Sequence, residues 1–116
     1  MKPGESHCLL RIFLGESDRS AGRPLWEVIL EILRKNHFSG ATVIRGIAGF
    51  GPKSVLHKET FFRFSPDLPV IIESVEREEK IRRLLPSIVD LMQGGLITME
   101  RAEVAYYGPG TRDPEE

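Results

Sequence analysis

Glycines and cations lie close together just after the apolar pair Val43 and Ile44. The glycines are Gly46, Gly49 and Gly51, and the flanking cations are Arg45 and Lys53. Glycine permits positive φ angles and lets another molecule approach the main chain closely. Exposed main-chain N–H groups beside two cations suit an anion such as a phosphate. A plain hairpin or bulge is the alternative interpretation, because a short glycine-rich run is a weak motif by itself.

Neighbouring side chains add to this candidate binding segment. Phe50 lies between two of the glycines, and His57 follows on the same stretch of chain. His57 could bind a ligand, form a subunit contact or sense pH near its unperturbed pKa of about 6.5. Arg45 and Lys53 could neutralise a phosphate, with ordinary solvated charge as the alternative.

Metal and catalytic chemistry are not indicated by the remaining reactive side chains. His7, His37 and Cys8 do not have the spacing of a zinc site, such as two cysteines two residues apart. No recognisable pairing of a nucleophile with a base occurs along the chain. We therefore expect no metal site, no catalytic residues and no enzyme activity.

Composition narrows the class of protein. The chain has 116 residues, which is the length of one domain, and 41% of them are hydrophobic. Its net charge of −1 argues against general nucleic-acid binding, which requires a basic surface. No apolar run approaches the roughly 20 residues that span a bilayer. The single Cys8 opens an apolar run, so we expect a buried thiol in a reducing compartment and a cytoplasmic protein.

Hydrophobic periodicity predicts alternating strands and helices. We expect strands at residues 8–14, 41–45 and 69–75, and a last strand-like stretch over 96–99 and 103–107 with a break or bulge near Arg101. Helices should begin at Pro24 and at about Glu76. Three ion pairs four residues apart should support the second helix: Glu76–Lys80, Glu78–Arg82 and Glu79–Arg83. Residues 46–66 have no clear period and are long for a connection, which is typical of a functional loop.

This order is βαββαβ, the ferredoxin-like arrangement of the α+β class. It predicts a four-stranded antiparallel sheet with two helices on one face. We expect one domain at residues 8–107, a flexible N-terminus at 1–7 and a flexible tail at 108–116. Residues 8–14 and 69–75 are apolar on both sides, so both sides need cover. No third helix is expected, and a second copy of the chain is therefore the expected cover, with clefts between subunits.

Several segments resemble those of a known family, in the same order along the chain. They are residues 13–16 (Phe-Leu-Gly-Glu), 40–51 with its Gly-Phe-Gly turn, His57, 65–70 (Ser-Pro-Asp-Leu-Pro-Val) and 76–81 (Glu-Arg-Glu-Glu-Lys-Ile). This pattern resembles PII-like signalling proteins, and within them the uncharacterised domain-of-unknown-function family 190. The resemblance runs from about residue 8 to residue 107.

The resemblance implies a homotrimer with its sheets packed inward and its helices outside. It implies no obligatory cofactor, but an adenine nucleotide (ATP, ADP or AMP) as an effector bound between subunits. The binding positions carried over are Gly49, Phe50, Gly51 and Lys53, with Gly94 and Gly95 opposite. The chain lacks the longer glycine- and lysine-rich loop of true PII proteins and the tyrosine-bearing loop tip that some of them use for modification. The protein partner is unnamed, with a membrane transporter as one candidate.

Two functions remain open from the sequence. The first is a regulatory protein that senses an adenine nucleotide or related anion and signals to a partner through residues 46–66. The alternative is an oligomeric interaction or scaffold protein with no small-molecule ligand. Binding of RNA by the same strand order is not expected, because residues 70–73 offer neither the aromatic nor the basic side chains that it needs.

Overall fold

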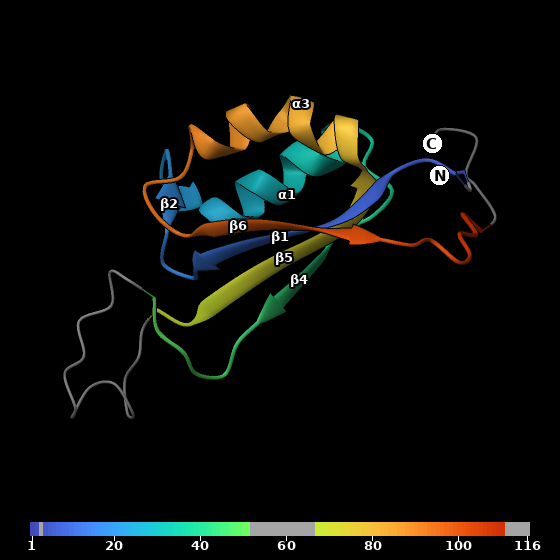
Figure 1. The fold of residues 1–116 in the computed structure, drawn as a ribbon. Coiled ribbons are helices and arrows are strands. Elements are labelled where there is room, and N and C mark those ends of the chain that lie inside the picture. The colour runs from blue at the N-terminus through green and yellow to red at the C-terminus, as the bar shows by residue number, and fades with distance from the viewer. Residues whose placement is uncertain (3, 52–66, 111–116) are drawn as a thin grey trace.

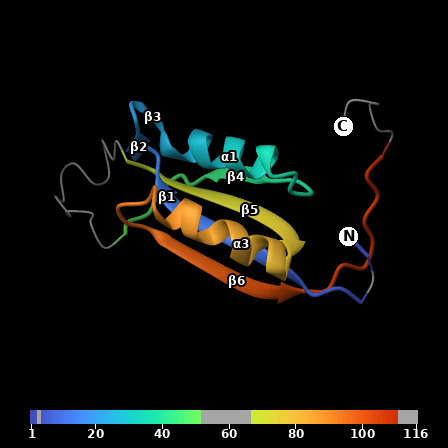
Figure 2. The ribbon, with the colours of Figure 1, turned by 90° about the horizontal axis from the view of Figure 1, so that it is seen from above.

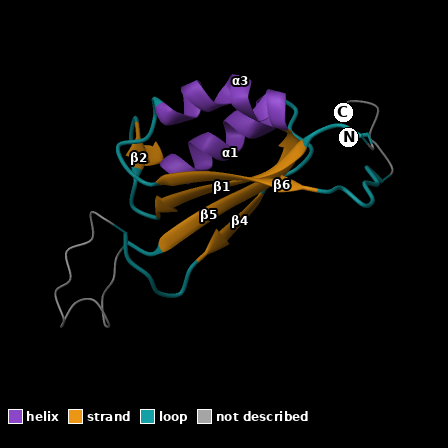
Figure 3. Cartoon of the chain, in the orientation of Figure 1, coloured by secondary structure: helices purple, strands orange, loops and turns teal. Residues whose placement is uncertain are grey.

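Two helices cover one face of a four-stranded antiparallel sheet in the computed structural model (Figures 1 and 3). The structure describes residues 1–2, 4–51 and 67–110. The elements, in chain order, are β1 (His7–Gly15), β2 (Arg19–Ser20), β3 (Arg23–Pro24), α1 (Leu25–Lys35), β4 (Thr42–Arg45), β5 (Pro69–Arg77), α3 (Glu78–Val89) and β6 (Leu96–Ala102). The α+β, ferredoxin-like prediction is confirmed. Neither described helix is long and apolar enough to cross a membrane.

The long strands β1 and β5 form the centre of the sheet. The strand order is β4-β5-β1-β6, and every neighbouring pair is antiparallel. Each residue of β1 is paired with β5, from His7 opposite Arg77 to Gly15 opposite Pro69. This register brings the end of β1 next to the beginning of β5, so the segments that follow and precede them must meet.

Alternation along β1 separates a covered face from an open one. Leu10 and Ile12 are buried under the helices, together with Ile72 of β5. From α1 and α3, which lie side by side over the sheet in Figure 2, the buried side chains are Leu25, Ile29, Leu33, Ile81 and Ile88. The three predicted ion pairs are present at 3.6 Å (Glu76–Lys80), 2.9 Å (Glu78–Arg82) and 3.9 Å (Glu79–Arg83).

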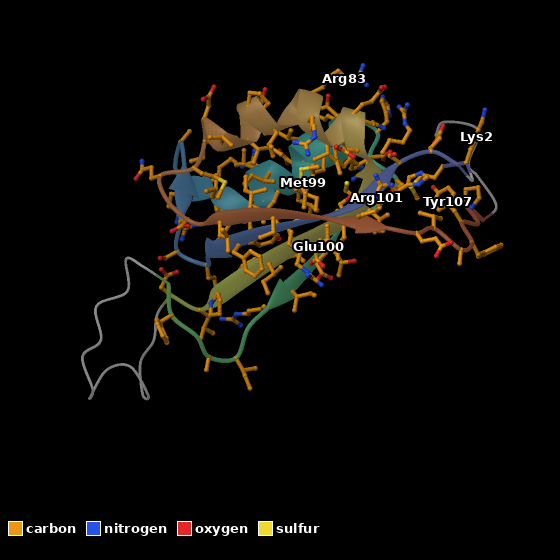
Figure 4. All side chains as sticks on the ribbon, in the orientation of Figure 1. Lys2, Arg83, Met99, Glu100, Arg101 and Tyr107 are labelled. Carbon is orange, nitrogen blue, oxygen red and sulfur yellow. The ribbon has the colours of Figure 1, made fainter. Side chains whose placement is uncertain are left out.

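The other face of the sheet is largely apolar and has no cover within the described chain. Figure 4 shows the two sides of β6, with Met99 directed toward the helices and Glu100 away from them. The open face carries Leu9, Phe13, Ile44, Ile71, Val75 and Leu96, of which Ile44 and Leu96 are the most exposed. In its middle, Arg11 binds Glu73 at 2.8 Å and Glu100 at 2.6 Å, and hydrogen bonding to Glu73 raises the pKa of Arg11.

Several boundaries differ from the predictions. β1 begins at His7, which is buried and paired on both sides, so the ordered sheet starts one residue earlier than expected. α3 begins at Glu78 because β5 continues to Arg77 against His7.

The strand predicted at residues 103–107 is wrong, and so is the break near Arg101. β6 runs without interruption through Arg101 to Ala102. It stops there because β1, with which it pairs among the described strands, begins at His7 opposite Ala102. The predictions made for residues 52–66 and 111–116 lie outside the described residues.

Candidate functional site

A cavity of about 720 Å³ lies at the end of the sheet where β1 ends and β6 begins. In Figure 1 this is the end of the sheet near β2. Its lining comes from the end of β1, the turn after it, the start of α1, the segments on either side of the long connection, and the turn before β6. The lining residues are Phe13, Leu14, Gly15, Asp18, Arg19, Leu25, Gly49, Phe50, Gly51, Asp67, Pro69, Leu91, Gln93, Gly94, Gly95 and Leu96.

The first glycine segment is held against the start of β5. Gly46 extends the β4–β5 pairing, since its N–H donates to the Pro69 carbonyl at 2.7 Å. A Cβ at Gly46 would lie 2.6 Å from Pro69 Cγ, and one at Gly49 would lie 3.0 Å from the same atom. Glycine is required here because the main chain packs directly on the proline ring. At Gly51 there is room for a side chain, because a Cβ there would meet no atom within 4 Å.

The second glycine segment forms the turn between α3 and β6. Gly95 has φ +106°, a value that side chains with a Cβ rarely adopt. A Cβ at this residue would also lie 2.5 Å from the carbonyl oxygen of Phe13, in the neighbouring strand. Gly95 therefore lets the turn lie flat against β1, which places Gly94 and Gly95 on the wall of the cavity.

Two carboxylates accept main-chain hydrogen bonds around the turn after β1, and one of these bonds joins the turn to the residues before β5. Asp18 accepts the Gly15 N–H at 3.0 Å, and Asp67 accepts the Ser17 N–H at 3.0 Å. The Asp67 carboxylate also occupies the position that a Cβ on Gly15 would need. Both aspartates line the cavity, so their acceptor oxygens are held at fixed places on its wall.

Arg19 is the only cation among the described residues that line the cavity. It lies in β2, opposite Pro24 of β3, and its side chain is exposed. Within the described part of the chain it forms no ion pair. The remaining walls combine apolar side chains and glycines with the polar Gln93, and a mostly apolar lining with a few polar groups is usual for a ligand pocket.

The structure brings together five of the predicted site residues and separates others. Gly49, Phe50, Gly51, Gly94 and Gly95 surround one cavity, although 43 residues or more separate the two segments in sequence. Whether they bind a ligand stays a prediction. Lys53 and His57 lie outside the described residues.

Arg45 and Gly46 do not line the cavity. The guanidinium of Arg45 instead binds both carboxylate oxygens of Glu16, at 2.6 and 2.9 Å. Gly46 has a packing role against Pro69, described above.

Sequence reasoning missed Asp18, Arg19 and Asp67. Their polar segments follow the first strand and precede the third, and an antiparallel pairing of those strands would have placed them together. Among the described residues lining the cavity there is no His, Cys, Ser, Thr or Lys. Likewise, no group of three metal-ligating side chains that could hold an ion occurs in the described ranges.

A family model named DUF190, described as Uncharacterized ACR, matches residues 7–104. The chain belongs to the DUF190 family. Two relatives carry the name UPF0166 protein. One, from Aquifex aeolicus, is 41% identical over 98 residues, covering 84% of this chain and 92% of the relative. The other, from Methanocaldococcus jannaschii, is 40% identical over 97 residues, covering 83% and 89%.

Solved structures of another protein share the fold of this DUF190 chain. CPII of Thiomonas intermedia K12, bound to ADP, AMP and acetate, matches with a TM-score of 0.63 at 16% identity, covering 88% of this chain and 91% of that one. A second structure, described as a nitrogen regulatory PII-like protein bound to ADP, AMP and bicarbonate, matches with a TM-score of 0.56 at 16% identity, covering 87% and 90%. The DUF190 family expected from the sequence is thus confirmed, and the solved structures, one of them described as PII-like, share its fold.

Proposed function

We propose that this DUF190 protein is a PII-like regulatory protein that senses an adenine nucleotide or a related anionic effector in the cavity at the end of the sheet. The observation that carries the proposal is the convergence of the Gly49–Phe50–Gly51 and Gly94–Gly95 segments on that one cavity. Binding, not catalysis, is its proposed chemistry.

The composition of the cavity suits such a ligand. A volume of about 720 Å³ falls within the range of about 300–1,000 Å³ found for small-molecule sites. Apolar walls at Phe13, Leu25 and Leu91 suit the flat faces of a base. The main chain at Gly49, Gly94 and Gly95, which line the cavity, can donate N–H groups to a phosphate. The ADP and AMP bound to the CPII structures of the same fold support this choice of ligand class.

We further propose that the chain assembles as a homotrimer with the cavity in the cleft between subunits. Phe13 and Leu96 belong both to the open sheet face and to the cavity wall. Another copy packed on the open face would therefore bury its apolar side chains and also close one side of the cavity. Burial of such a face is worth about 25 cal/mol per Å² of apolar surface removed from water.

Signalling is proposed to pass through residues 46–66 to a protein partner in the cytoplasm, with a membrane transporter as one candidate. Gly49, Phe50 and Gly51 start this segment and also wall the cavity. A ligand that contacts them in one conformation and not in another shifts the balance between the two, and a partner can read that shift.

Isothermal titration with ATP, ADP, AMP and cyclic adenine nucleotides tests the proposal. Gly51→Val should weaken the measured affinity about tenfold or more, because it adds bulk at the cavity wall where no other atom is displaced. Gly40→Val is the matched control, since a Cβ at Gly40 also meets no atom within 4 Å and Gly40 does not line the cavity. No heat from any nucleotide with the intact assembly would contradict the proposal.

The second candidate function is an oligomeric scaffold without a small ligand. The open apolar face favours it, because that face explains assembly without requiring an effector. A pull-down that retrieves the same partner equally with and without nucleotides, and equally with Gly51→Val, would support the scaffold over the sensor.

A further inference from the structure

We infer that the cavity selects a nucleotide with a single phosphate, held by Arg19, over nucleotides with a longer phosphate chain. The inference rests on the proposed function, because it names the ligand class of the same cavity. The deciding feature is the charge that the described residues place around the cavity: one guanidinium, Arg19, and two carboxylates, Asp18 and Asp67.

Arg19 is placed to meet a phosphate. Its main chain is fixed by pairing with Pro24, and the preceding carbonyl, that of Asp18, accepts the N–H of Leu25 at 2.8 Å. No carboxylate within the described residues pairs with its guanidinium. A planar guanidinium that has no protein partner can bind two phosphate oxygens at once, which gives a short, charge-assisted contact.

Among the described residues that line the cavity, no second cation is present to support a longer phosphate chain. Arg45 is the last residue of β4 and lies at the same end of the sheet, but its Nε and one Nη donate to the two carboxylate oxygens of Glu16. The other described residues of the lining carry no positive charge. Each phosphate group brings about 1.5 to 2 negative charges when it is terminal, and one arginine offsets only part of a di- or triphosphate.

Asp18 and Asp67 should disfavour binding of additional phosphates and favour binding of hydroxyl groups. Each has one oxygen hydrogen-bonded to a main-chain N–H, Asp18 to that of Gly15 and Asp67 to that of Ser17. An ionised carboxylate accepts several hydrogen bonds and donates none, so its remaining capacity suits the hydroxyl groups of a ribose. A phosphate beside either carboxylate would meet like charge. The lining therefore matches a ligand with one anionic end and a hydroxyl-rich body.

The test is a set of dissociation constants for adenosine, AMP, ADP and ATP, measured by titration calorimetry on the full chain in EDTA and again with Mg²⁺. The wild-type protein should bind AMP about tenfold or more tightly than ATP. Arg19→Gln should lower the affinity for AMP about tenfold, which brings it close to the affinity for adenosine. The reason is that charge-assisted contacts are among the stronger hydrogen bonds. Adenosine itself should bind Arg19→Gln as it binds wild type, which shows that the cavity is intact.

Two further variants complete the design. Arg34→Gln makes the same change at an exposed position of α1 outside the lining and should leave all four constants unchanged. Asp18→Asn keeps an acceptor for the Gly15 N–H but removes a negative charge, so it should narrow the preference for AMP over ATP several-fold.

The outcomes separate the two proposals. If no adenine compound binds wild type, the proposed function fails. If nucleotides bind but ATP binds as tightly as AMP, or Arg19→Gln leaves AMP affinity unchanged, the sensing function stands and the single-phosphate inference is overturned.

Discussion

Gly95→Ala should destabilise the protein by about 2–6 kcal/mol. The first contribution is conformational, because a residue with a Cβ at φ +106° costs roughly 1–3 kcal/mol. The second is steric, because the new Cβ would lie 2.5 Å from the Phe13 carbonyl oxygen and 2.9 Å from Met92 Cε. The methionine can rotate away, but the carbonyl belongs to the central strand β1 and cannot. Overpacking of this kind adds about 1–3 kcal/mol.

Such a loss is large beside the 5–15 kcal/mol by which typical domains are stable. For a chain of this size it should lower the thermal midpoint by about 8–24 °C. The assay is thermal and urea unfolding followed by circular dichroism, without nucleotide and at one fixed protein concentration, since assembly makes the midpoint depend on concentration. Gly51→Ala is the matched control and should leave the midpoint nearly unchanged, because its Cβ has open space. A midpoint for Gly95→Ala within about 2 °C of wild type would refute the described turn.

Three further predictions follow from the charges and the thiol. Arg11→Ala should shift the assembly toward monomers in light scattering, because it leaves two carboxylates unpaired on the open face. Arg23→Ala also removes an arginine that is bound to two glutamates, but it should not change the oligomer size. Equal oligomer sizes for the two variants would argue against packing through the open face. Hydrogen bonding to Arg23 lowers the pKa of Glu31 below its ordinary 4.5, so its stabilising contribution is complete above that pH and is lost as pH falls through the folded-state pKa. Urea midpoints at pH 5 and pH 3 should therefore differ less in Glu31→Gln than in wild type, and an unchanged difference would contradict this pairing. Burial raises the pKa of the Cys8 thiol, and Glu78 adds to the effect, so an aromatic disulfide reagent should label it only as fast as the chain unfolds; immediate labelling of the native protein would show that the thiol is accessible.

The helix and sheet layers of the fold could be predicted from the sequence because they depend on hydrophobic patterns within single segments. The apolar run at residues 8–14 marked a strand, and the spacing of Leu25, Ile29 and Leu33 marked one side of a helix. Local ion pairs such as Glu78–Arg82 followed from helical geometry alone, since residues four apart lie on the same side of a helix.

The ends of strands were harder to predict from the sequence because they depend on pairing with another strand that is far away in the chain. Residues 103–107 have a composition typical of a strand, yet they lie beyond the pairing of Ala102 with His7. The two-residue strands β2 and β3 are too short to produce a periodic signal. The sequence pattern therefore gave no indication that Arg19, which belongs to this hairpin, would line the cavity.

The sequence by itself determined the order of strands and helices, the apolar character of both sheet faces and the glycine segments that wall the cavity. Those features reside in local spacing and in residue type. Only the tertiary structure decided which charged residues belong to the site. In it, Arg45 forms an ion pair with Glu16, whereas Arg19 and Asp67 line the cavity. The physical reason is that an ion pair or a cavity wall depends on distances between segments remote in the chain, as in the hydrogen bond that joins Ser17 to Asp67 across 50 residues. Such distances are set by the antiparallel register of β1 and β5, which no single segment encodes.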